Sequence, residues 1–266
     1  MGEGECVEQR RLILISVMQY EDALLAGTLA TRDVVAVAAR LGVAGVEVRP
    51  EFWRDKAREL PEVRDLLAAH GLLVTNATRN TLFSAAPAGA AALREDIDDT
   101  VTLGAGQLRV FPGQLPADDD GAGWAAGRAL VDYAAARGIV LALENFSGSP
   151  GGRLAEIAAV LDRYPAPALA TNIDIGNYTR HGDDVPTAIR VLGARAISAH
   201  LKDQFGPPDF ESQPLGGGAL PLGAIMAELE RLPQRLIYCF EFRGGGDPEG
   251  RIVGSLAYLR ERRWRK

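Results

Sequence analysis

The chain has 266 residues, of which 47% are hydrophobic and 24% are charged, and 35 acidic against 29 basic residues give a net charge of −6. These values are typical of a folded globular protein and exclude a disordered or fibrous one. The acidic balance argues against broad attraction to nucleic acid or to an anionic membrane surface. Because two cysteines are too few for a disulfide framework and no apolar run approaches the roughly 18 residues of a membrane helix, we expect a cytoplasmic protein.

Short apolar runs that are typical of buried strands recur along the chain. They occupy residues 12–17, 44–48, 72–77, 107–111, 139–145, 168–174, 196–201 and 235–242. The first run is too short for a secretion signal, and the acidic segment before it is the wrong flank for one. Segments of helical period separate the strands, and most of them close on a glycine, which favours the left-handed conformation that ends a helix. These glycines are Gly42, Gly71, Gly104, Gly138 and Gly193.

Successive strands start 28 to 39 residues apart, which is the length of a strand, a crossover helix and two loops. Eight near-equal units with strands apolar on both faces indicate an all-parallel sheet. An open doubly wound sheet could also hold them, but no Gly-x-Gly-x-x-Gly follows the first strand, and the eight repeats favour closure. We therefore predict an α/β protein with a single-domain (β/α)₈ TIM barrel over residues 11–266, preceded by a polar N-terminal tail over residues 1–10.

The last four predicted strands each end in a side chain that can bind a metal ion. These side chains are Glu144, Asp174, His200 and Glu241, in strand order. Because the carboxyl ends of barrel strands share one rim, the four side chains should meet there. Three carboxylates and one imidazole suit Mn²⁺, Mg²⁺, Co²⁺ or Zn²⁺, and without a cation the carboxylates would repel one another. A single such residue is more simply explained as a core histidine or a helix cap, but four in succession favour a metal site.

Other polar residues near the same rim are candidates for contacts with a substrate. Lys202 lies two residues beyond His200 on the same strand face, where its ammonium could stabilise developing negative charge or simply reach the solvent. Arg243, beside a helix start predicted at Asp247 and Pro248, could hold an anionic group. Three further candidates near the ends of the first three strands are Tyr20, Glu47 and Asn76.

Five stretches of the chain, in this order and spacing, resemble the xylose isomerase-like barrel superfamily and its sugar isomerase/epimerase branch. They are GVEVRP, GIVLALENF, NIDIGN, SAHLKD and FEFRGGG, and the resemblance extends from residue 12 to about residue 259. The family carries its metal ligands at the positions of Glu144, Asp174, His200 and Glu241, which implies a divalent metal ion, with Mn²⁺ expected first. The resemblance also implies a polyol or hydroxy-carbonyl substrate, an enediolate held on the metal, and proton transfer by Glu144 and Glu241.

Three departures from the family pattern narrow this expectation. Asn177 stands where many members have a histidine, Gly206 where ketose 3-epimerases have an arginine, and Pro150 where they have a glutamate. A plain ketose 3-epimerase is therefore in doubt, and Asn177 is a candidate for substrate binding. The first hypothesis is a metal-dependent isomerase or epimerase. The second is a metal-dependent dehydratase of an inosose-like or dehydroshikimate-like substrate, which starts from the same proton removal.

Two other classes of function are less well supported. Abasic-site endonucleases share the barrel but need a histidine-rich zinc cluster and a basic mouth, whereas this chain is acidic and has three histidines. A metal-free binding relative would not need the intact set of four ligands. We therefore expect a small-molecule substrate, neutral or anionic, and neither nucleic acid nor membrane as a partner. The sequence leaves open the substrate, the metal, the stereochemical outcome and whether the chain forms a homo-oligomer.

Overall fold

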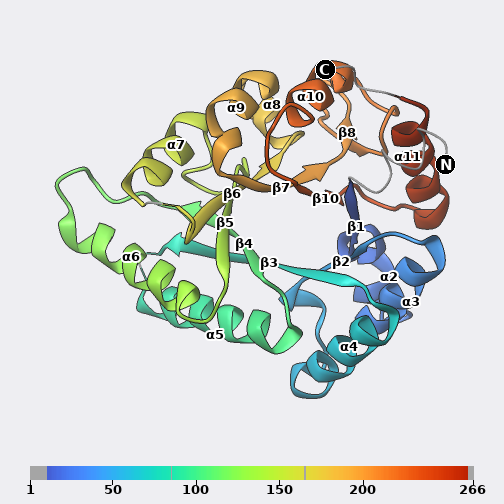
Figure 1. Ribbon diagram of the computed structural model, residues 1–266, viewed down its shortest axis with the longest axis horizontal. Helices are drawn as coiled ribbons and strands as arrows, with labels where there is room; N and C mark the ends of the chain where they lie inside the picture. Colours follow the sequence, from blue (N-terminus) through green and yellow to red (C-terminus); the bar gives the residue numbers. More distant parts are fainter. Residues whose placement is uncertain (1–10, 85, 165, 263–266) are drawn as a thin grey trace.

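Eight parallel strands close into a barrel in the computed structural model, which describes residues 11–84, 86–164 and 166–262 (Figure 1). Going around the barrel, the strands are β1 (Leu12–Ser16), β10 (Ile237–Phe240), β7 (Ala196–Leu201), β6 (Leu169–Asp174), β5 (Val140–Glu144), β4 (Gln107–Gly113), β3 (Leu73–Phe83) and β2 (Gly45–Val48). The predicted TIM barrel is confirmed. The predicted N-terminal tail, residues 1–10, lies outside the described residues.

Helices surround the barrel on its outer side (Figure 1). The α-helices are α2 (Glu21–Ala26), α3 (Thr31–Leu41), α4 (Lys56–His70), α5 (Pro87–Leu103), α6 (Gly121–Ala135), α7 (Leu154–Arg163), α8 (Asn177–Arg180), α9 (Val185–Leu192), α10 (Leu222–Leu229) and α11 (Pro248–Glu261). Three short 3₁₀ segments are η1 (Val17–Tyr20), η2 (Pro50–Phe52) and η3 (Gly193–Arg195). Within the described ranges, none of the helices has the length and hydrophobicity that crossing a membrane requires.

Four of the five glycines predicted to end helices have the expected positive φ, and one does not. Gly42, Gly71 and Gly104 follow α3, α4 and α5 in the left-handed conformation, and Gly138 also has a positive φ. Gly193 instead has a φ of −56° and begins η3. A Cβ at Gly193 would lie 2.4 Å from a terminal methyl carbon of Leu232, which would have to move to make room for it.

Alternate residues of each strand point into the barrel, and this parity decides which polar groups can meet. Inside the barrel, the amide of Gln107 on β4 donates to Ser198 of β7 at 3.2 Å. Two residues further along β7, His200 points inward and meets Glu47 of β2. Apolar side chains fill the layer between the strands and the helices. The barrel thus encloses a column of polar groups that ends at its carboxyl rim.

Two parts of the fold differ from the elements predicted from the sequence. Strand β3 extends to Phe83, because a register shift between Ala77 and Thr81 lets it continue pairing with β4. Its polar segment resembles a loop in sequence, but Asp96 of α5 accepts hydrogen bonds from Thr78 and Asn80, both at 2.6 Å. After β7, a hairpin of β8 (Asp203–Gln204) and β9 (Ser212–Gln213) forms where only a loop was expected.

The close packing of β2 against β3 gives a test of the fold. A Cβ at Gly45 would lie 2.0 Å from the carbonyl oxygen of Leu73, which is backbone and cannot rotate away. We expect Gly45→Ala to lower the free energy of unfolding by more than about 2 kcal/mol in urea titrations. Gly254→Ala on α11, where a Cβ would meet nothing within 4 Å, is the control and should leave stability unchanged or raise it by up to about 1 kcal/mol. Equal stability of the two variants would contradict this account.

Candidate metal centre

Four side chains from neighbouring strands converge at the carboxyl end of the barrel. They are Glu144 at the end of β5, Asp174 at the end of β6, His200 on β7 and Glu241 directly after β10. Asp174 and His200 are partners in the sheet register, so their side chains lie at the same height. One ligand atom from each of the four residues lies within 4.8 Å of the others. The structure therefore brings together the set that the sequence predicts as metal ligands.

The ring of His200 turns its Nδ1 atom toward the three carboxylates. Nδ1 lies 2.9 Å from Glu144 Oε2, 3.4 Å from Glu241 Oε2 and 3.8 Å from Asp174 Oδ2. It nevertheless has no well-directed hydrogen bond, which is rare for a buried polar atom. A shared cation would satisfy this nitrogen together with the carboxylate oxygens around it. The donor set therefore fits a divalent metal ion.

Asp174 uses its two carboxylate oxygens for different purposes. Oδ1 accepts hydrogen bonds from the backbone N–H groups of Gly176 and Asn177, at 2.9 and 3.0 Å, and so caps the start of α8. The side chain of Asn145 fixes the backbone of Asp174 by donating to its carbonyl oxygen and accepting from its N–H, both at 2.9 Å. Oδ2 faces the other ligands. Helix capping and metal ligation are thus compatible in this residue.

Three buried cations pair with the carboxylates of the cluster. The Lys202 ammonium lies 2.7 Å from Asp174 Oδ2 and 2.8 Å from Glu241 Oε2. Burial opposes a charged amine, but these two carboxylates raise the pKa of Lys202, so it is an ammonium at neutral pH. With a side chain only 10% exposed, Lys202 does not reach out to the solvent. The other two cations are Arg49, which pairs with Glu241 and Glu47, and Arg109, whose Nε lies 3.2 Å from Glu144 Oε2.

The carboxylates differ in how fully they are ionised. Burial, together with the negative charges of Glu241 and Glu144, raises the pKa of Asp174 to about 7 despite the nearby Lys202. Burial also opposes ionisation of Glu144 and Glu241, but the surrounding cations lower the pKa of Glu144 and bring that of Glu241 well below its usual range. Both glutamates are therefore ionised at neutral pH, whereas Asp174 still competes for a proton.

The charges of the cluster nearly balance. Its acidic members are Glu47, Glu144, Asp174 and Glu241, and its basic members are Arg49, Arg109 and Lys202. Four negative and three positive charges would leave one excess negative charge. Burial opposes a charge on His200, but the carboxylates around it raise the pKa of the ring well above its ordinary value, so a proton on His200 balances this charge when no metal ion is bound. A divalent cation in place of this proton would leave one excess positive charge, which would favour a substrate that is negative or becomes negative during the reaction.

A cavity of about 340 Å³ opens onto this cluster. Phe111 and Phe146 form an aromatic wall, with ring centroids 4.8 Å apart. The acidic residues that line the cavity are Glu21, Glu144 and Glu241, and the basic ones are Arg49, Arg79, Arg109, Arg180, Lys202 and Arg243. In a chain with a net charge of −6, this excess of basic side chains is a local property of the cavity.

Two residues predicted as substrate contacts line this cavity. Asn177, at the start of α8, is 6% exposed and faces it. Arg243 lies at the rim with its side chain 73% exposed and one guanidinium nitrogen 3.8 Å from Glu21. Beside Arg243, α11 begins at Pro248 after an Asp247 cap, as the sequence predicts.

Three other residues predicted as substrate contacts do not line the cavity. Asn76 points out of the barrel, because its neighbour Thr75 occupies the inward position opposite Glu47, and its amide donates to Thr100 of α5 at 3.0 Å. Tyr20 packs in the core and lines a neighbouring cavity of about 740 Å³ at the start of α11. Glu47 is 2% exposed and lies behind His200 instead of facing the substrate side. Strand parity turns Asn76 outward, whereas Tyr20 belongs to η1 and Glu47 lies inside the barrel behind His200.

The sequence analysis missed two groups that hold Glu144 in place. Arg109 contacts the carboxylate from β4 and also donates to the carbonyl oxygen of Thr78 at 2.6 Å, while the amide of Asn172 donates to Glu144 Oε2 at 2.7 Å. A signal was present, since an arginine within the apolar run QLRVF must find a partner if that strand is buried. Its partner could not be read from the sequence.

Comparisons with known proteins agree with this architecture. A family model described as xylose isomerase-like TIM barrel matches residues 35–262. A comparison with curated protein sequences gave no match.

Several solved structures share the fold at low sequence identity. A D-allulose 3-epimerase from Methylomonas sp. is 19% identical with a TM-score of 0.72, and the alignment covers 95% of this chain and 98% of that one. A D-tagatose 3-epimerase-like protein is 15% identical with a TM-score of 0.76, covering 94% and 96%. A probable 3-DHS dehydratase, AsbF from Bacillus anthracis, is 14% identical with a TM-score of 0.76, covering 94% and 99%. At these identities the similarity establishes the fold alone.

The pairing of Arg109 with Glu144 predicts a strong coupling between the two residues. Both are at most 2% exposed, so Arg109→Met leaves a buried carboxylate without its main cationic partner. We expect the free energy of unfolding, measured in urea, to fall by ~3–5 kcal/mol. Adding Glu144→Gln to Arg109→Met should recover part of this loss, because the unpaired charge is then removed. Strictly additive effects in this double-mutant cycle would show that the pair is not coupled.

Proposed function

The chain belongs to the xylose isomerase-like TIM barrel family, and from this premise we propose that it is a divalent-metal-dependent isomerase or epimerase of a sugar-like hydroxy-carbonyl compound. One observation carries the proposal. The ligand atoms of Glu144, Asp174, His200 and Glu241 lie within 4.8 Å of one another, and His200 Nδ1, which faces the three carboxylates, has no well-directed hydrogen bond. These four residues would hold the ion. Mn²⁺ is the first candidate, and Mg²⁺, Co²⁺ and Zn²⁺ suit the same donors.

When bound, the ion would polarise the carbonyl group of the substrate and so acidify the hydrogen on the adjacent carbon. Glu144 and Glu241 come from opposite ends of the row β5, β6, β7 and β10, and both are ionised at neutral pH. In the proposed reaction one of them removes that proton. It then returns the proton to the neighbouring carbon, or the other glutamate takes up a proton from water and delivers it to the opposite face while the first passes its proton back to water. Lys202 and Arg109, both facing the cavity, would stabilise the negative charge that develops on the substrate oxygens.

A dehydratase is the second candidate, and the position of Lys202 favours it. Its ammonium is held by Asp174 and Glu241 inside the cavity, where a proton donor could assist the departure of a hydroxyl group from the β-carbon. Removal of the α-proton by a glutamate followed by loss of this hydroxyl as water yields a conjugated carbonyl compound. The first step is shared with the isomerase, so the substrate and the later fate of the intermediate separate the two candidates.

The basic lining of the cavity supports an anionic substrate. Arg180 is the clearest case, because its guanidinium contacts the carbonyl oxygen and the ring of Phe210, with no carboxylate among its described contacts. Arg243 lies at the same rim with its side chain mostly exposed. We therefore include a carboxylate or phosphate group in the proposed substrate class, placed at the rim while the hydroxy-carbonyl part reaches the ligand cluster.

Deuterium exchange tests the reaction class. In D₂O, Mn²⁺-loaded protein incubated with candidate ketoses and cyclitol ketones should incorporate deuterium at the carbon next to the carbonyl. Exchange without loss of water identifies an isomerase or epimerase, and a new conjugated carbonyl chromophore identifies a dehydratase. Removing the metal with EDTA should abolish either signal, and Mn²⁺ should restore it.

Glu144→Gln and Glu241→Gln should each reduce this exchange by at least about a hundredfold, because the glutamine amide cannot accept the proton. Glu59→Gln is the matched control, since Glu59 is 7% exposed but caps the start of α4, far from the cluster. A fully active variant at either position would remove that residue from the proton-transfer role.

The position of Arg180 at the rim predicts that its loss weakens substrate binding without affecting the chemical step. With an anionic substrate, Arg180→Gln should raise KM about tenfold and change kcat little, because the lost contact serves binding equally in the ground and transition states. Arg190→Gln on α9, an exposed arginine that pairs with Glu228, should leave KM unchanged. Equal KM values for Arg180→Gln and the unmodified protein, tested with both carboxylated and phosphorylated substrates, would contradict the anion contact.

A further inference from the structure

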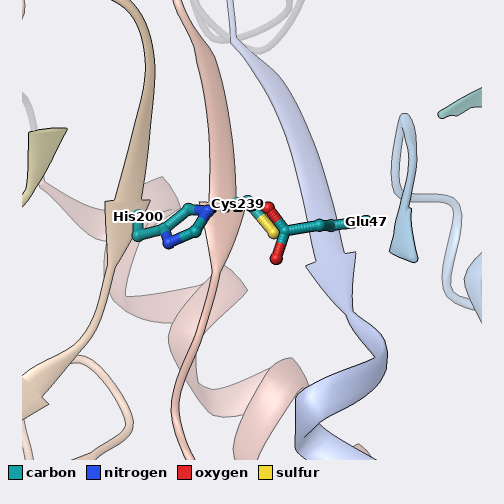
Figure 2. Close-up of side chains that lie close together, drawn as sticks. All are labelled: Glu47, His200 and Cys239. Carbon is teal, nitrogen blue, oxygen red and sulfur yellow. Dashed lines mark hydrogen bonds and ion pairs between the residues drawn. The ribbon is translucent and has the colours of Figure 1, made fainter. Parts of the chain in front are cut away.

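Glu47 contacts the proposed metal ligand His200 from the side opposite the three other ligands. Figure 2 shows the two side chains pointing toward each other inside the barrel, from β2 and β7. Glu47 Oε2 lies 2.7 Å from His200 Nε2, and both side chains are 2% exposed. The other ring nitrogen, Nδ1, faces Glu144, Asp174 and Glu241. The imidazole is therefore clamped between one carboxylate and the ligand cluster.

This contact determines which nitrogen of His200 keeps its proton when the ring is neutral. An ionised carboxylate can only accept a hydrogen bond, so Nε2 must be the protonated nitrogen at this distance. In the neutral ring, Nδ1 then carries the free lone pair and points it at the cluster. A carboxylate behind a ligating histidine also raises the basicity of the ring and fixes its orientation.

The carboxylate of Glu47 is itself held in place by two donors. Its Oε1 accepts hydrogen bonds from the hydroxyl of Ser16 at 3.0 Å and from Arg49 at 3.3 Å. Burial opposes the charge on Glu47, but His200 and the arginines lower its pKa to about 2. The two oxygens of Glu47 thus accept hydrogen bonds from three donors, Ser16, Arg49 and His200, which the single oxygen of a glutamine amide cannot do.

Cys239 lies beside this pair, and a separate metal site formed by Glu47, His200 and Cys239 is the alternative (Figure 2). The oxygens of Glu47 are already engaged, and the thiol contacts the carbonyl oxygen of Phe240 at 3.7 Å. These contacts favour a supporting role for Glu47 behind the proposed metal site over a second metal site.

We propose that Glu47 is a positioning residue that presents the lone pair of His200 Nδ1 to the metal ion. The proposal rests on the metal centre of the proposed function and adds a residue that touches neither ion nor substrate. Carboxylates in this position contribute 10- to 100-fold to metal affinity in other metal sites.

Metal titration and histidine NMR of the full chain test this role. We expect Glu47→Gln to weaken Mn²⁺ binding, measured by calorimetry, by about 10- to 100-fold. Glu47→Asp keeps the charge but withdraws it from the ring, so it should also lose affinity if the contact, and not the charge alone, is responsible. Ser16→Ala, which removes one donor to Glu47, should weaken Mn²⁺ binding about threefold. If the Glu47 variants fail to fold, Ser16→Ala tests the inference in their place.

The chain's three histidines make the NMR measurement direct. In the Zn²⁺-loaded protein labelled with ¹⁵N-histidine, His200 should show a protonated Nε2 and a metal-bound Nδ1. In Glu47→Gln only the His200 signals should change, with His70 and His181 as internal references. Glu59→Gln is again the matched control and should change neither affinity nor spectrum.

The outcomes separate this inference from the proposed function. If the unmodified chain retains no divalent ion, the metal-dependent function fails and the inference fails with it. If it binds one ion, but Glu47→Gln binds Mn²⁺ within twofold of the unmodified chain and its His200 signals are unchanged, the inference alone is overturned. Two ions per chain, with the second lost in Cys239→Ser, would replace it with the alternative site.

Discussion

The mutual repulsion of carboxylates that the barrel forces together is the constraint on which the site depends. Glu144, Asp174 and Glu241 come within 4.8 Å of each other and of His200 in a buried space, where charges are poorly screened. Such a cluster is stable only if positive charge is supplied. Buried arginines and a lysine supply most of it, and a proton on His200 or the proposed divalent ion would balance the rest. The basic side chains and the ligand set are therefore parts of one electrostatic arrangement.

The barrel makes this arrangement possible because it fixes the level of each side chain along the barrel axis and whether that side chain points inward or outward. Parallel strands deliver their last inward side chains at one rim, and the register of β6 with β7 places two ligands level with each other. One layer deeper, inward side chains from strands on other sides of the barrel can meet across its interior. Glu47 reaches His200 in this way, although the two residues are 153 positions apart in the chain. Supporting contacts thus come from strands that carry no ligand of their own.

The same fold serves more than one reaction. Both a sugar 3-epimerase and a probable dehydratase share this fold with TM-scores above 0.7. Their sequences differ too much from this chain for the fold to decide among reactions, because function resides in the site. In this chain the cavity has a basic lining and an aromatic wall formed by Phe111 and Phe146. Substrate choice therefore depends on the loops and strand ends around the cluster.

The sequence by itself determined the barrel and the four strand-end side chains that are proposed as metal ligands. Hydrophobic runs, helix-ending glycines and unit length are local properties, and the position of a ligand at a strand end follows from them once the sheet is parallel. The tertiary structure alone decided which polar residues face one another. Asn76 turned outward to Thr100, Glu47 turned to His200, and Arg109 found Glu144, because inward or outward direction and partners across the barrel depend on register and strand tilt. These are properties of the closed sheet as a whole, and no single segment encodes them.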